Sequence, residues 1–94
     1  ALYNAGLTLY KRSSTAAEEL GAIDPMNKTE FDAKLKEVDD LQMEAMGLLE
    51  RAYAAKPTDK NTVEILKAIY FRFRDRSDEM MKNYEKYNEL FKSM

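Results

Sequence analysis

A single proline near the middle of the chain constrains the fold most, because it separates two segments that each carry the apolar spacing of a buried helix face. The apolar residues are Ala45, Leu48, Leu49 and Ala52 before it and Val63, Leu66, Ile69 and Tyr70 after it. Pro57 has no N–H for a continuing helix, so the first helix ends before it. Thr58 or Asp59 can accept hydrogen bonds from the free N–H groups that begin the next helix. This pattern predicts two helices joined by a very short connection.

The composition favours one small all-α domain. The chain has 94 residues, 45% of them apolar, and only three Gly and two Pro. Histidine and cysteine are both absent, which removes the usual ligands of zinc, haem and iron–sulfur clusters and the Cys/His and Ser/His nucleophile pairs. We therefore expect no enzymatic activity, no cofactor and no bound metal.

Charge and hydropathy limit the classes of partner that we expect for this chain. Fifteen basic and 17 acidic residues are interspersed and give a net charge of −2, so no broad positive surface is available for phosphates. We expect a protein or peptide partner and no nucleic acid. No stretch approaches the roughly 20 apolar residues of a membrane span. The cytoplasm and the bacterial periplasm both remain open as locations. Because Ala1 lies directly inside an apolar helical pattern, we expect the chain to be part of a longer one.

Four helices are predicted, over residues 1–21, 28–55, 60–74 and 77–93. The first carries the stripe Leu2, Ala5, Leu9, Ser13, Ala16 and Leu20. Gly21 is a plausible terminator of this helix, and Asn27 with Glu30 fits a capping box for the second. Asp75 or Ser77 can cap the last helix. The stripe of the last helix is Met80, Tyr84, Tyr87, Phe91 and Met94.

The helices are expected to pair as two antiparallel hairpins, the first of them longer. Equal rise per residue around the first turn makes the numbers of facing residues sum to about 51. Ser13 then lies opposite Val38, and Gly6 lies opposite Ala45, where two small residues allow close approach. The same rule in the second hairpin places Leu66 opposite Tyr84 and Val63 opposite Tyr87.

Ten residues in a fixed order carry a resemblance to a known repeat family. They are Tyr3, Asn4, Ala5, Gly6, Leu9 and Tyr10 in the first predicted helix, then Ala45, Leu49, Ala52 and Pro57. This pattern resembles the tetratricopeptide (TPR) repeat, whose unit of roughly 34 residues is a helix pair. The resemblance implies a TPR-like α–α superhelix in which about 13 inserted residues lengthen each helix of the first hairpin. The second repeat is degenerate, since Lys67 stands where the family carries a small residue. The resemblance therefore implies that the chain is the C-terminal part of a longer repeat array, because fewer than three repeats seldom bury a continuous core.

The resemblance also implies where a partner would bind. TPR domains bind peptides or proteins on the face formed by the first helix of each repeat, which here corresponds to Tyr3, Asn4, Leu7, Tyr10, Lys11, Glu64, Ala68, Phe71 and Arg72. Tyr10 and Phe71 are the strongest candidates, because both are large aromatics off the main stripe of their helix. The alternative is that Tyr3, Leu7 and Tyr10 pack against another helix. Asn4 resembles an asparagine of the carboxylate-clamp type of TPR, but the matching basic partners are not in place.

Three further patterns have a plain structural interpretation beside a functional one. Asp39, Asp40 and Glu44, with Glu18 and Glu19, contain the ligands for a divalent ion, but are more typical of a solvated face. The methionines Met43, Met46, Met80 and Met81 suit either an adaptable binding surface or core packing. Arg72, Arg74 and Arg76 can meet an acidic partner or compensate the dipole at a helix C-terminus.

From the sequence we predict a non-catalytic protein–protein interaction or scaffolding module. The alternative is a structural module in which the long hairpin associates with a second copy of itself.

Overall fold

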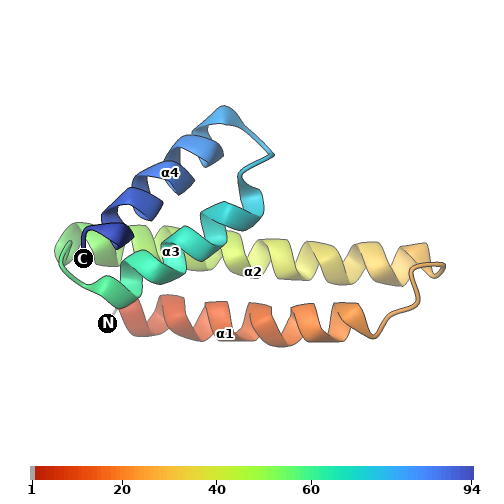
Figure 1. Ribbon diagram of the computed structural model, residues 1–94. Coiled ribbons are helices and arrows are strands. Elements are labelled where there is room, and N and C mark those ends of the chain that lie inside the picture. The colour runs from red at the N-terminus through yellow and green to blue at the C-terminus, as the bar shows by residue number, and fades with distance from the viewer. Residues whose placement is uncertain (1) are drawn as a thin grey trace. The chain divides into compact units, whose positions relative to one another are not determined.

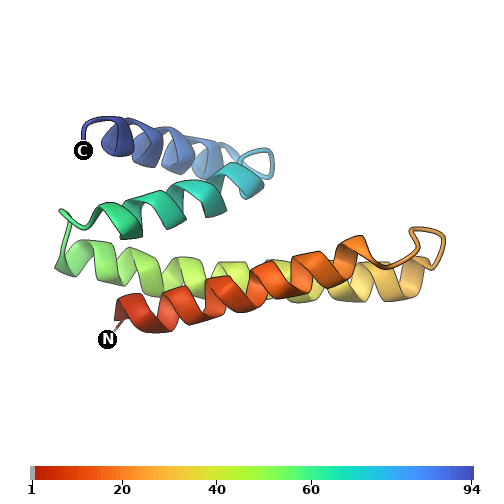
Figure 2. The same cartoon turned by 60° about the horizontal axis from the view of Figure 1, so that its bottom comes forward.

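The computed structural model describes residues 2–94, which form four helices: α1 (Leu2–Gly21), α2 (Lys28–Ala55), α3 (Lys60–Phe73) and α4 (Asp78–Lys92). Figures 1 and 2 show them as two hairpins, α1 with α2 and α3 with α4, the first of which is longer. The all-α class and the paired arrangement predicted from the sequence are thus confirmed. No helix among these residues is long and apolar enough to cross a membrane.

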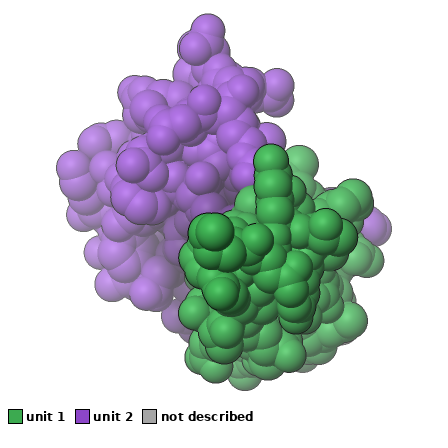
Figure 3. Space-filling model, turned by 90° about the vertical axis from the view of Figure 1, so that its right-hand side faces the viewer, with its two compact units in different colours: residues 1, 3–48 green, residues 2, 49–94 purple. Residues whose placement is uncertain are grey.

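The chain forms two compact units, coloured separately in Figure 3. The first unit contains residues 3–48, which are α1 and most of α2. The second contains residues 49–94 together with Leu2, so the last turns of α2 belong with α3 and α4.

Side-chain caps begin the last two helices, as expected. Asp59 accepts a hydrogen bond from the Asn61 N–H at 3.0 Å, and Ser77 accepts one from the Met80 N–H at 3.1 Å. At the start of α2 the predicted capping box takes another form, because the Asn27 amide donates to the Glu30 carboxylate at 2.8 Å. Gly21 is the last residue of α1, but no glycine among residues 2–94 has a positive φ, so no left-handed cap forms there.

Small and apolar residues fill the interior of the first unit. Gly6, Ser13 and Ala16 are the buried residues of α1, and Val38 and Ala45 of α2 are at most 1% exposed. Ala5, which the stripe predicted to be buried, is exposed. Gln42 is buried too, and its amide donates to the Ser13 hydroxyl at 3.3 Å. Its amide oxygen has no hydrogen-bond partner among residues 2–94. The predicted contact between Gly6 and Ala45 remains a prediction, although both residues are buried.

Contacts across both hairpins are displaced from the predicted register in the same direction. Ser13 bonds to Gln42, one helical turn beyond Val38. In the second hairpin Tyr84 contacts Phe71 and Tyr87 stacks on Tyr70, so the α3 partners lie nearer the turn than Leu66 and Val63.

This displacement has a common cause in side-chain direction. Side chains lean toward the N-terminus of their own helix. In an antiparallel hairpin they therefore lean away from the turn on the first helix and toward it on the second. Residues that touch consequently have their Cα atoms nearer the turn on the first helix and farther from it on the second. The predicted pairing places residues at equal distances from the turn opposite each other, and therefore does not include this shift.

A cluster of aromatic rings and one carboxylate holds the second unit together. Tyr87 is fully buried, stacks on Tyr70 at 5.7 Å between ring centroids, and meets Tyr53 edge-on at 5.3 Å. The Glu50 carboxylate accepts hydrogen bonds from the Tyr87 hydroxyl at 2.6 Å and the Tyr70 hydroxyl at 3.2 Å. Burial and the nearby Glu50 carboxylate both raise the pKa of the two phenols. The cluster fastens the end of α2 to α3 and α4.

Candidate binding surface on α3 and α4

The α3 helix carries two distinct faces. Its buried face contains Thr62, Val63, Leu66, Ile69, Tyr70 and Phe73. A second stripe with helical spacing is Lys60, Glu64, Lys67 and Phe71, continued by Arg74 just after the helix. These residues are exposed or half-buried. The first stripe builds the core, and the second presents a different surface, on which one large aromatic ring is exposed.

A groove with an aromatic lining lies along this second stripe, between α3 and α4. We call it the aromatic groove; its lining residues are Glu64, Lys67, Ala68, Phe71, Tyr84 and Phe91, and its volume is about 300 Å³. Phe71 remains 48% exposed. Its ring meets Tyr84 edge-on, with 5.4 Å between the centroids. The groove is therefore a largely apolar concavity lined by side chains of α3 and α4; Figure 1 shows these two helices as one hairpin.

Cationic side chains lie over the rings of this groove. The Lys60 and Lys67 ammonium groups are 5.2 and 4.7 Å from the Phe91 ring centroid. The Arg74 guanidinium lies 3.8 Å from the centroid of Phe71 and donates a hydrogen bond to the Phe71 carbonyl oxygen at 2.6 Å. Such contacts hold the cations against the negative faces of the rings. Arg74 also satisfies a C-terminal carbonyl of α3, as helix-dipole compensation predicts.

The structure brings three of the predicted partner-binding residues, Glu64, Ala68 and Phe71, together in this groove. Arg72 is placed differently. It is half-buried, and its guanidinium lies 5.2 Å from the centroid of Phe73, a core residue. Arg72 is therefore not one of the lining residues.

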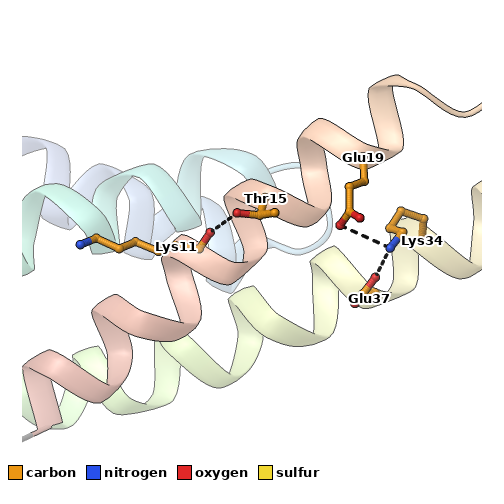
Figure 4. Close-up of polar contacts among 5 residues, drawn as sticks. All are labelled: Lys11, Thr15, Glu19, Lys34 and Glu37. Carbon is orange, nitrogen blue, oxygen red and sulfur yellow. Dashed lines mark hydrogen bonds and ion pairs between the residues drawn. The ribbon is translucent and has the colours of Figure 1, made fainter.

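The other predicted residues belong to α1, in the first unit. Tyr3, Leu7 and Tyr10 are half-buried, whereas Asn4 and Lys11 are exposed. The Asn4 carbonyl oxygen accepts the Thr8 hydroxyl at 2.9 Å, and the Lys11 carbonyl oxygen accepts the Thr15 hydroxyl at 3.3 Å. Figure 4 shows the Lys11 side chain extending away from the neighbouring ion pairs that Lys34 forms with Glu19 and Glu37.

A second depression, in the first unit, has a more polar lining. It has a volume of about 360 Å³ and is lined by Arg12, Ala33, Lys36, Glu37, Asp40, Leu41 and Glu44. Several of its charges are neutralised locally, since Lys36 pairs with Asp40 at 2.7 Å and Lys34 with Glu37 at 2.7 Å. No group of three or more acidic residues within 2–94 is arranged to hold a metal ion.

Sequence reasoning missed three lining residues of the aromatic groove. In the sequence, Lys67 differs from the repeat pattern. The apolar stripe of the last helix predicts that Tyr84, Tyr87 and Phe91 all lie inside the second hairpin, but Tyr87 alone of the three is buried. The available signal was the second stripe of α3, which alternates cations with Glu64 and Phe71 at helical spacing.

The fold and this groove define the class, which is an all-α protein of paired helices with an open aromatic groove on its second pair. No family model, curated protein or solved structure matches the chain.

Proposed function

We propose that this chain is a non-catalytic protein–protein interaction module of the TPR type, and that it binds a helical segment of a partner in the aromatic groove. Two helical hairpins are the architecture that such repeats share. The small residues of the repeat pattern also support the proposal, since Gly6 is buried and Ala45 is 0% exposed.

The exposed Phe71 ring carries the proposal. A phenylalanine that keeps 48% of its surface exposed, inside a concavity walled by Tyr84 and Phe91, is the arrangement that large apolar anchors of a partner fill. The groove follows one helix face, and an amphipathic helix that lies in an apolar groove is a recurring mode of recognition.

The test selects helical peptides from a displayed library against the wild-type chain and measures their binding to two variants. Phe71→Ala removes the exposed ring of the groove. Met43→Ala is the matched control, because Met43 is an apolar side chain of similar exposure, 44%, in the first unit. We expect Phe71→Ala to weaken the selected peptides by at least tenfold, or about 1.4 kcal/mol, and Met43→Ala to leave them unchanged. Peptides that bind Phe71→Ala as tightly as the wild type would refute the groove as the binding surface.

A further inference from the structure

We infer that the partner of the aromatic groove is an acidic amphipathic helix, one whose apolar stripe is flanked by Asp or Glu. This inference rests on the proposed function and specifies the charge of the partner. The juxtaposition that carries it is a row of three cations over the aromatic rings of the groove, one of which, Lys67, is itself a lining residue.

Lys60, Lys67 and Arg74 recur every seven residues, so they lie on one face of α3. The row is about 21 Å long at 1.5 Å per residue. That length matches about four turns of a helix lying along it. The two lysines lie over Phe91 and the arginine lies over Phe71, so each cation borders the apolar surface that a partner would cover.

The charges of this row are not neutralised within the part of the chain that the structure describes. Glu64 lies four residues after Lys60 and three before Lys67, a spacing that allows ion pairs with both. Neither lysine forms an ion pair there, and both ammonium groups lie over Phe91 instead. Arg74 uses one N–H on the Phe71 carbonyl, and a guanidinium has five. The cations thus keep donors for carboxylates of an incoming helix.

An acidic amphipathic helix is complementary to this surface in two ways. Its apolar stripe covers Phe71 and Phe91, while its carboxylates meet ammonium and guanidinium groups held beside those rings. A basic helix would instead bring like charges together as water is excluded, which selects against it. The α1 helix of this chain carries Lys11 and Arg12 near its middle, and Glu18 and Glu19 near its end.

The test uses two helical peptides with the same apolar stripe, flanked by Glu in one and by Lys in the other, titrated by fluorescence anisotropy. We expect the acidic peptide to bind at least tenfold tighter at low salt, and most of this difference to disappear near 1 M salt, where the Debye length is about 3 Å. Equal binding of the two peptides, with both abolished by Phe71→Ala, would overturn the charge inference and leave the proposed function standing. Failure of both peptides to bind would overturn both.

The second part of the test reverses the charge of one residue of the chain. Lys67→Glu should weaken the acidic peptide by about threefold or more and strengthen the basic one. Lys82→Glu is the matched control, because it makes the same charge change at an exposed position of α4 that faces away from Tyr84. Equal effects of the two reversals would argue for net charge rather than for the groove. A single-stranded oligonucleotide that displaces the acidic peptide as effectively as unlabelled peptide does would reassign the groove to nucleic acid and overturn the inference.

Discussion

At the scale of the residue, Glu50 connects the parts of the second unit. Its carboxylate is the shared acceptor of two buried phenols, and hydrogen bonds to a charged group contribute more to stability than neutral ones. Removing one donor leaves a partly buried carboxylate with a single phenol, so the cost includes the lost solvation of the carboxylate.

Tyr87→Phe should therefore lower the free energy of unfolding by about 1.5–3 kcal/mol. Tyr84→Phe is the matched control on the same helix, since it keeps the ring contact with Phe71 and its hydroxyl has no protein partner among residues 2–94. Urea denaturation followed by circular dichroism measures both. Similar denaturation midpoints for the two variants would show that the hydrogen bond from Tyr87 to Glu50 does not stabilise the fold.

The same phenols predict an alkaline limit to stability. Their pKa values are raised in the folded chain, so above the ordinary tyrosine pKa of about 10 the unfolded chain has released protons that the folded chain still holds. The contribution of these two phenols to the free energy of unfolding should be constant below that pH and should fall as the pH rises through and beyond it. Lys34 and Lys36, whose pKa values are also raised by their ion pairs, act in the same direction. The double variant Tyr70→Phe with Tyr87→Phe should flatten the decline measured by denaturation between pH 8 and about pH 11. An unchanged slope would exclude the phenols as its cause.

At the scale of the element, helix ends could be predicted because local chemistry determines them. Pro57 cannot continue a helix, and Asp59 and Ser77 carry the oxygens that caps require. The groove could not be predicted, because Tyr84, Tyr87 and Phe91 share one broad stripe, and only the packing of α3 and α2 determines that Tyr87 is buried. The register of the contacts across each hairpin differs from the prediction, because it depends on the tilt of the side chains toward the N-terminus of their helix.

Two neighbouring substitutions in α2 should change stability in opposite directions. Ala45 is 0% exposed, so Ala45→Leu overpacks the interior and should cost about 1–3 kcal/mol. A Cβ at Gly47 would meet no atom within 4 Å, so Gly47→Ala should gain about 1 kcal/mol from helix propensity alone. Thermal denaturation compares the two with the wild type. An Ala45→Leu variant as stable as the wild type would contradict the close packing at this position.

At the scale of the whole molecule, the interaction module competes with the self-associating hairpin considered from the sequence. The aromatic groove places the proposed binding surface on α3 and α4, and the self-associating alternative places it on the long first hairpin. Under the proposed function, sedimentation equilibrium should give the mass of a single chain at micromolar concentration. A dimer that persists in Phe71→Ala would support self-association through another surface.

The most direct test of the central claim maps the bound surface residue by residue. The acidic helical peptide is titrated into the chain uniformly labelled with nitrogen-15, and amide chemical shifts are followed by NMR. The proposed groove predicts that the largest changes fall on Glu64, Lys67, Ala68, Phe71, Tyr84 and Phe91. Changes concentrated instead on Tyr3, Asn4, Leu7, Tyr10 and Lys11, with the α3 and α4 residues unaffected, would contradict it and return the binding surface to α1.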